Sequence, residues 1–218
     1  MSSMPSQLPP AERWGSRNAP QLAGARVTLR PVTPPDYPFL FDLTTDPSIG
    51  YRWRLRGAVP SPAGFETALW EQVFAQFVIW DNRGPEPCGL VTAYAADARN
   101  RIAYFAIVHR QRAAALSSVP VDALLLFLQY LFTVWDFRKL YAESPEYAYE
   151  DFASGAGKYF EVEARLPEYH YFDGKYWDNL VISVSRERFA EIASRTMSRV
   201  LDRSTSPHGD ATGAVAYE

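Results

Sequence analysis

Two kinds of hydrophobic pattern alternate along the chain between residues 25 and 203. Apolar residues at every second position, or short continuous apolar runs, predict strands, whereas longer runs with a period near 3.6 predict helices. The predicted strands cover 27–30, 77–80, 88–94, 101–108, 139–144, 159–165 and 175–184. The predicted helices cover 37–43, 62–75, 119–137 and 147–158, and a last helix begins at Ser185. The pattern therefore predicts an α+β fold with a sheet of about seven strands flanked by helices.

The helix expected over 119–137 has apolar residues on nearly every face. A helix of this kind is buried on more than one side, so we expect it between the sheet and another element. Ser185 stands before the last helix and is a suitable N-cap, with Glu187 in the first turn.

Both ends of the chain lack such a pattern. Residues 1–24 are rich in Pro, Ser and Ala, and 204–218 form a similar polar tail. We interpret both as disordered, because they contain too little apolar surface to offset the entropy of ordering. Nothing between them looks like a linker, which predicts one domain over 25–203.

Composition and charge narrow the class of protein. The chain has 218 residues with 47% hydrophobic content and a net charge of −3, which gives no general attraction for nucleic acid. The single cysteine, Cys88, excludes an intramolecular disulfide framework and indicates a cytoplasmic protein; we interpret it as a buried strand residue rather than a nucleophile. No apolar run is long enough to span a membrane. Three histidines and one cysteine, far apart, predict no metal site.

One segment carries a recognisable order of elements. The strand 101–108 is followed by a loop over 109–118, the long helix with Ala123 and Leu124, and the strand 139–144. This order resembles the core of the GNAT superfamily of N-acyltransferases. Val27-Thr-Leu-Arg-Pro-Val32, together with 161–166 and 173–178, is similar to the ribosomal-protein N-acetyltransferase branch.

The resemblance implies a mixed, mostly antiparallel central sheet and a reaction in which an amine attacks a thioester. It also implies that the strands 101–108 and 139–144 splay apart to admit the pantetheine arm. Backbone N–H groups around Phe105, Ala106, Ile107 and Val108 would then stabilise the oxyanion that develops on the thioester carbonyl.

The loop departs from the pattern of the resembled family. There, an Arg/Gln-x-x-Gly-x-Gly/Ala motif holds the pyrophosphate of coenzyme A, but here the glycine positions fall near Leu116, Ser118 and Pro120. Proline has no N–H to offer a phosphate, and the larger side chains keep the backbone at a distance.

Two interpretations of this loop remain open. Ser117 and Ser118 could cap the helix while other N–H groups bind the phosphates of coenzyme A. Alternatively the donor is a phosphopantetheine arm on an acyl carrier protein, which has a single phosphodiester. His109, Arg110 and Arg112 would then meet that phosphate or an acidic carrier surface. We favour the carrier protein.

The base and the general acid cannot be taken over from the family. Tyr104 stands where the branch often has a glutamate, and Gly155 stands where the family has a tyrosine. We therefore predict catalytic roles for His170, whose ordinary pKa suits a base at neutral pH, for Glu143, which ends a strand beside the pantetheine, and for Tyr147.

The acceptor site is predicted from the aromatic and cationic residues near the first helices. Trp53 and Arg54 belong to an alternating Arg-aromatic stretch that could bind an anionic acceptor or dock a protein. Tyr104 and Tyr171 complete the expected acceptor-binding set.

These residues favour an N-acyltransferase that forms an amide on a small-molecule amine in a biosynthetic pathway. A coenzyme-A-dependent N-acetyltransferase is the first alternative, and a non-catalytic module that binds acyl thioesters or proteins is the second. Transfer from aminoacyl-tRNA is disfavoured by the net charge, because phosphate contacts dominate such binding. The expected partners are an acyl carrier protein and a small amine, with no nucleic acid and no membrane.

Overall fold

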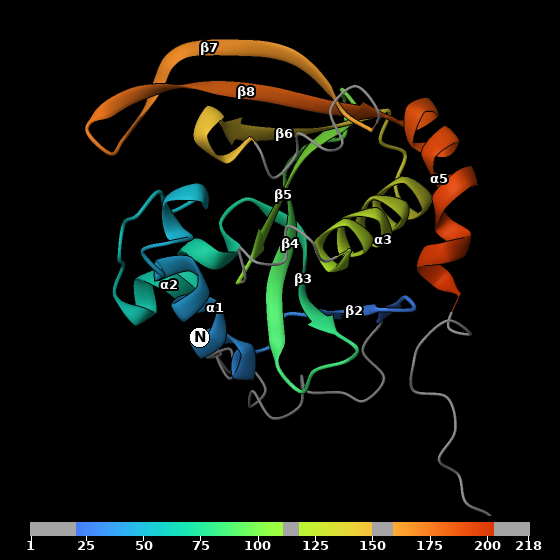
Figure 1. Cartoon of the computed structure of the whole chain (residues 1–218), viewed down its shortest axis with the longest axis horizontal. Coiled ribbons are helices and arrows are strands. Elements are labelled where there is room, and N and C mark those ends of the chain that lie inside the picture. Colours follow the sequence, from blue (N-terminus) through green and yellow to red (C-terminus); the bar gives the residue numbers. More distant parts are fainter. Residues whose placement is uncertain (1–20, 111–117, 150–158, 203–218) are drawn as a thin grey trace, which may run out of the picture.

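The computed structural model describes residues 21–110, 118–149 and 159–202. Within these residues eight strands form one sheet in the order β1-β2-β3-β4-β5-β6-β8-β7, and only β5 and β6 pair in parallel (Figure 1). The predicted α+β class and mostly antiparallel sheet are confirmed. The strands are β1 (Leu22–Ala23), β2 (Val27–Pro31), β3 (Val73–Asp81), β4 (Pro87–Asp97), β5 (Ile102–His109), β6 (Lys139–Pro145), β7 (Glu161–Phe172) and β8 (Lys175–Ser185).

The eighth strand is β1, which the sequence pattern does not predict. Its two residues pair with β2 inside the stretch 1–24 that we expected to be an arm, so the sheet begins earlier than the predicted domain. Two residues are too short to show an alternation.

Helices cover both faces of the sheet. On one face lie the 3-10 turns η2 (Pro34–Asp36) and η3 (Gly50–Arg52) with α1 (Tyr37–Thr45) and α2 (Pro62–Trp70), and on the other lie α3 (Val119–Val134) and α5 (Arg186–Leu201) (Figure 1). Each layer encloses its own hydrophobic cluster, centred on Leu40 and Phe65 beneath α1 and α2 and on Phe105 and Phe127 beneath α3. The long helix α3 is thus packed between the sheet and α5, as its apolar pattern predicts.

Two helix ends differ from the sequence prediction. The helix expected over 62–75 stops at Trp70, because Gln72 has a φ of 55° that no α-helix continues and Val73 already begins β3. The helix expected to reach residue 137 ends at Val134. By contrast, the Ser185 cap is confirmed, since its side chain accepts a hydrogen bond from the N–H of Arg188.

The C-terminal hairpin is longer than predicted. β7 continues to Phe172 and β8 starts at Lys175, so the strand expected over 159–165 extends through His170. Asp173 and Gly174 both have positive φ, 51° and 78°, as two-residue turns between antiparallel strands require. The helix expected over 147–158 is represented by one 3-10 turn, η5 (Glu146–Ala148), and residues 150–158 lie outside the described part.

The parallel pair β5–β6 separates along its length. Only three positions are in register, Ile102 with Lys139, Ala103 with Leu140 and Tyr104 with Tyr141. Beyond them β5 stays paired with β4 as far as His109, while β6 stays paired with β8 as far as Pro145. The predicted splaying of these strands is confirmed, and we call the region beyond Tyr104 and Tyr141 the fork (Figure 1). None of the described helices is long and apolar enough to cross a membrane.

Candidate functional site

The β5 arm of the fork directs backbone N–H groups toward β6. The N–H of Arg110 donates to the carbonyl of Cys88 on β4 at 2.9 Å. Because N–H directions alternate along a strand, those of Val108 and Ala106 also face β4, whereas those of Phe105 and Ile107 face the fork. Ile107 lies beyond the last β5–β6 pair. Of the four residues predicted to supply oxyanion donors, Ile107 is therefore the one oriented for it, because the N–H of Phe105 takes part in the pairing of Tyr104 with Tyr141.

The region where β5 ends and α3 begins contains the predicted phosphate-binding residues. Arg110 is exposed, and its guanidinium lies 5.1 Å from the centroid of the Phe39 ring on α1. His109 ends β5, and Ser118 is the N-cap residue of α3 without a side-chain cap hydrogen bond. Arg112 and Ser117 lie outside the described residues.

The first turn of α3 is already occupied by charge. Pro120 contributes no N–H, and the buried carboxylate of Asp122 forms ion pairs with Arg26 at 2.7 Å and Arg199 at 3.5 Å. A helix N-terminus attracts anions, and here a carboxylate of the protein itself already takes up part of that attraction.

A row of tyrosines crosses the base of the fork on the face covered by α1 and α2. Tyr94, Tyr104 and Tyr141 lie on three adjacent strands with ring centroids 5.8 and 5.6 Å apart, and we call them the tyrosine row. Burial raises the pKa of Tyr94 to about 12, and it also raises the pKa of Tyr104. The hydroxyl groups of Tyr94 and Tyr104 therefore stay protonated at neutral pH and can donate hydrogen bonds.

Glu143 lies on the β6 arm of the fork, two residues beyond Tyr141 and on the same side of the strand. Its side chain is exposed and has neither a hydrogen bond nor an ion pair within the described chain. Its negative charge helps to raise the pKa values of Tyr94 and Tyr104. It also acts to raise the pKa of His170, against the larger effect of burial, which lowers it. Glu143 thus lies beside the tyrosine row, and its charge acts on His170.

His170 lies on β7 and is connected to β6 through Asn179 of β8. Its Nε2 is 3.0 Å from Oδ1 of Asn179, and Asn179 is opposite Pro145 in the sheet. Burial, and secondarily the charge of Arg56, lower the pKa of His170 below its ordinary 6.5, so the ring is neutral at pH 7. The Asn179 oxygen accepts the Nε2–H, which leaves Nδ1 with the lone pair that a base needs.

Tyr147 has a different environment from that expected of a general acid. Its hydroxyl donates to the carbonyl of Tyr51 at 3.3 Å, and burial raises its pKa. Its ring packs between Tyr51, Phe172 and Trp177, and Tyr51 stacks on Phe172 with centroids 4.0 Å apart. We call these four residues the aromatic bridge, because they join the tip of the β7–β8 hairpin to η3.

The stretch after η3 brings cationic residues to the tyrosine row. The Arg54 guanidinium lies 5.1 Å from the Tyr94 ring centroid and donates to the carbonyl of Glu71 at 2.8 Å. Arg56 is exposed, and its charge acts on Tyr94, Tyr147 and His170. The predicted acceptor residue Trp53 is only 5% exposed and packs in the core beneath α2.

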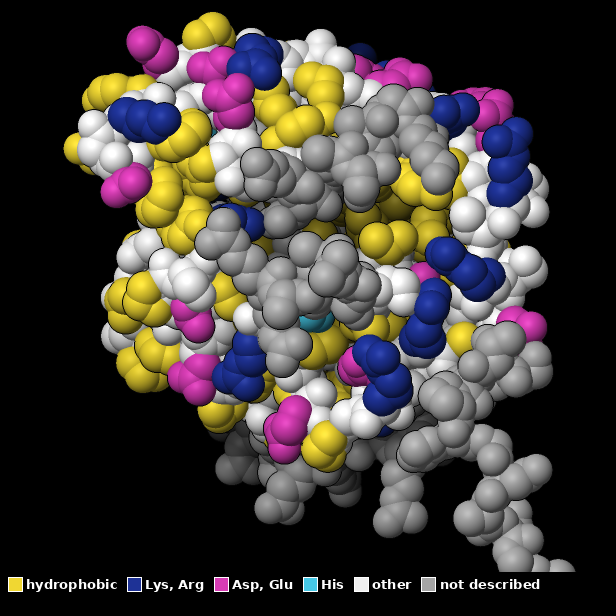
Figure 2. All heavy atoms as spheres, in the orientation of Figure 1, with side chains coloured by type: hydrophobic (Ala, Val, Ile, Leu, Met, Phe, Trp, Pro, Cys, Tyr) yellow, Lys and Arg dark blue, Asp and Glu magenta, His cyan; other side chains and the backbone are white. Residues whose placement is uncertain are grey.

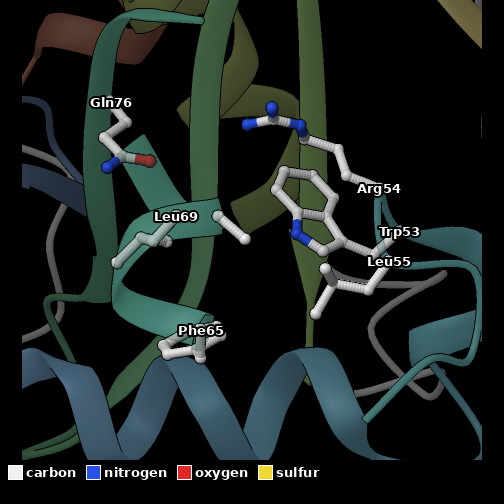
Figure 3. Close-up of a pocket in the computed structure, with 7 residues that line it drawn as sticks. Trp53, Arg54, Leu55, Phe65, Leu69 and Gln76 are labelled. Atoms are coloured by element: carbon white, nitrogen blue, oxygen red, sulfur yellow. The ribbon is translucent and has the colours of Figure 1, made fainter. Parts of the chain in front are cut away.

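A small cavity of about 20 Å³, room for about one water molecule, lies beside Arg54 (Figure 3). Its lining is apolar apart from Arg54 and Gln76, which reach it from opposite sides. Gln76 is 6% exposed, and its amide nitrogen has no hydrogen-bond partner among the described residues.

The structure does not bring Tyr171 to these residues. It is 67% exposed and packs against Tyr176, on the side of the strand opposite to His170 and Phe172. Apolar and aromatic side chains gather on this outer part of the hairpin (Figure 2). Tyr94, Tyr141, Gln76 and Asn179 are, conversely, residues that the sequence analysis missed. Among the described residues no group of three His, Cys, Asp or Glu side chains is placed to hold a metal ion.

Comparison with known proteins identifies the fold. No protein-family model matches the chain, and no curated protein sequence matches it significantly. Among solved structures, the spermidine N-acetyltransferase of Vibrio cholerae in complex with CoA and spermine is 19% identical with a TM-score of 0.61, covering 76% of this chain and 98% of that one. A probable GNAT-family acetyltransferase of Chromobacterium violaceum ATCC 12472 is 17% identical with a TM-score of 0.63, covering 81% and 96%. The chain therefore has the GNAT fold.

Proposed function

We propose that the protein is an N-acyltransferase that moves an acyl group from a pantetheine thioester to a small-molecule amine. The observation that carries this proposal is the fork, where the N–H of Ile107 has no pairing partner on β6 and where Glu143 lies on the opposite arm. The solved structures with the same fold are acetyltransferases, and one of them was crystallised with CoA and an amine.

The residues around the fork fit the chemistry of amide formation. The ammonium group of the acceptor loses one proton to Nδ1 of His170, and the amine attacks the thioester carbonyl carbon. The N–H of Ile107 stabilises the negative charge that develops on the carbonyl oxygen. The C–S bond then breaks, and the leaving sulfur takes the second proton from nitrogen. An amide and a free thiol result, and His170 releases its proton to solvent.

The donor in this proposal is an acyl carrier protein, and the pathway is biosynthetic. The first turn of α3 supports this choice, because Pro120 offers no N–H to a pyrophosphate and the same turn already contains the carboxylate of Asp122, which pairs with Arg26 and Arg199. Free coenzyme A is the alternative donor, and the acetyltransferase crystallised with CoA favours it.

Calorimetric titration with coenzyme A and acetyl coenzyme A separates the two donors. We expect no detectable binding, and transfer from an acylated carrier protein. Micromolar binding of coenzyme A would replace the carrier by the free cofactor. Changing Arg110 and Arg112 to Glu should abolish transfer from the carrier while sparing an acylated pantetheine fragment, and equal loss with both donors would exclude docking through these arginines.

The enzymatic proposal itself has a separate test. If the protein only binds thioesters, no acylated amine forms with any donor, and thioester binding survives in His170→Gln. We expect instead that turnover of an acyl pantetheine thioester with added amine requires His170.

A further inference from the structure

The charges around the tyrosine row are unbalanced. Arg54 and Arg56 both act on the Tyr94 hydroxyl, where they oppose the effect of Glu143. Neither arginine forms an ion pair with a described residue, although the Arg56 side chain also hydrogen-bonds the Tyr147 hydroxyl. Two guanidinium groups and one carboxylate thus act on the same ring, that of Tyr94. A ligand that complements them carries both a positive and a negative group.

Unsatisfied polar groups lie beneath Arg54. Gln76 of β3 and Thr92 of β4 are opposite each other in the sheet, and both lie on the face that bears the tyrosine row. The Gln76 amide nitrogen and the Thr92 hydroxyl are buried without a partner in the described chain. Buried donors are nearly always satisfied in native proteins, so these two indicate a polar ligand group or a bound water at this position.

The cationic part of the ligand fits the other end of the row. Glu143 is beyond Tyr141, beside His170, and offers an unpaired carboxylate to an ammonium group. Tyrosine ring faces attract cations in addition. The amine therefore lies beside Glu143 at the fork, where the thioester is expected, while the negative group lies toward Arg54 over the Tyr94 ring; the charge of Arg56 reaches both Tyr94 and His170.

We propose that the acceptor is an amino acid or a similar small molecule, whose carboxylate is held by Arg54 and Arg56 while its amine is acylated at the fork. Guanidinium groups bind carboxylates through paired, charge-assisted hydrogen bonds, which makes them specific for this group. The inference rests on the proposed acyl transfer and adds the class of the acceptor.

This class differs from that of the V. cholerae neighbour, which was crystallised with spermine. A polyamine carries positive charges along its whole length, and two of them would lie against Arg54 and Arg56. Like charges in contact disfavour binding, so the same fold here selects against polyamines.

Binding of matched ligand pairs tests the proposal without a donor. The pairs are alanine with ethylamine and phenylalanine with phenethylamine, whose members differ only in the carboxylate, and spermidine is added as a polyamine. Affinities are measured by saturation-transfer NMR titration of the purified protein. In at least one pair we expect the acid to bind about tenfold tighter or more, because a hydrogen-bonded charge contributes roughly 1.5–3 kcal/mol.

Variants attribute this preference to the arginines. In Arg54→Gln and Arg56→Gln the preference for the acid should decrease, and in the double variant it should disappear while the amine binds as before. Arg30→Gln is the matched control, because Arg30 also lies over an aromatic ring, that of Trp80 at 4.3 Å, but on β2. Melting temperatures exclude unfolding as the cause.

Several results would overturn the proposal. The first is that the simple amines or spermidine bind as tightly as the amino acids. The second is that no amino acid of the panel binds. The third is that the preference for the amino acid survives in the double variant. Acyl transfer to amines that lack a carboxylate, without a preference for amino acids, would refute this inference and leave the proposed function intact. Amino-acid binding without acyl transfer would refute the proposed function and leave the inferred class of ligand intact.

Discussion

The two sides of the fork depend on different parts of the chain, the donor side on backbone groups and the acceptor side on side chains. On the donor side, the features that matter are backbone groups of β5 and the place where β5 and β6 stop pairing. On the acceptor side they are side chains, namely the tyrosine row, Glu143, Arg54 and Arg56. A backbone feature survives almost any substitution that keeps the strand, whereas a charge pattern changes with one residue.

This difference explains what a fold comparison can and cannot transfer. The chain shares 17–19% of its residues with two proteins of the same fold, enough to retain the diverging strands. The side chains that contact an acceptor are among the residues free to vary. We therefore expect the reaction to follow the fold and the choice of acceptor to follow this chain's own sequence.

The largest effect is expected on the side-chain half of this comparison. Replacing His170 by Gln removes the base while Gln can still hydrogen-bond Asn179, and we expect the transfer rate to fall about 10²–10⁴-fold. Because the pKa of His170 is lowered and the neutral ring is active, the wild-type rate should rise with pH and reach half of its maximum below the ordinary histidine pKa of 6.5. This rise of the rate with pH should be missing in His170→Gln, which a measurement of kcat over a series of pH values would show.

Tyr176→Phe is the control for this experiment, since Tyr176 is 63% exposed on the outer side of the same hairpin. An unchanged pH profile in His170→Gln would assign proton removal to another group. It would also leave the acceptor side with binding functions alone.

The second largest effect is expected from a change to the backbone on the donor side of the fork. Ile107→Pro removes the N–H that faces the fork but no hydrogen bond to β4, so the strand should stay paired. Loss of one oxyanion donor typically costs about 10²–10³ in kcat, and we expect a loss of that size.

Two further variants control the proline experiment. Ile107→Val keeps the N–H and should keep the rate, whereas Ala106→Pro removes a β4 ladder bond and should lower the melting temperature instead. If Ile107→Pro is folded and fully active, the donor side does not work through its backbone.

The fold could be predicted to this extent because its signals are local. Each strand around the fork is a short apolar run, and α3 is apolar on nearly every face, which determines both type and burial. The errors lie at boundaries, such as Gln72, where one left-handed residue converts the end of a helix into a strand. Hydrophobic pattern does not reveal backbone angles of this kind.

The site is less predictable because it depends on register between distant segments. Asn179 meets His170 only because β8 lies between β6 and β7, and Tyr94 joins the row only through its pairing with Tyr104. Tyr147 lies in the aromatic bridge because the Asp173-Gly174 turn extends the hairpin to η3. Residue type indicated Glu143 and His170 as candidates, but their common surroundings follow from tertiary structure.

A smaller effect is expected where the acceptor side is closed by the aromatic bridge. Tyr51 and Phe172 stack directly, and such a pair contributes about 0.5–1.5 kcal/mol beyond its buried area. A double-mutant cycle with Tyr51→Leu and Phe172→Leu, followed by urea unfolding, should give a coupling free energy of about that size. The exposed pair Tyr171 and Tyr176 serves as the reference and should couple less. Equal couplings would mean that the bridge does not hold the hairpin to η3.

The smallest effect is expected at Cys88, the single cysteine of the chain, which lies on β4 next to the donor side. Burial raises the pKa of its thiol to about 11, so only about one molecule in 10⁴ carries a thiolate at pH 7. Its sulfur instead donates a weak hydrogen bond to the carbonyl of Ile79 at 3.4 Å. Labelling with a disulfide reagent should therefore be slow, and Cys88→Ala should retain the wild-type rate. Rapid labelling that abolishes transfer would place a reactive side chain beside the fork, and the donor side could no longer be described by its backbone alone.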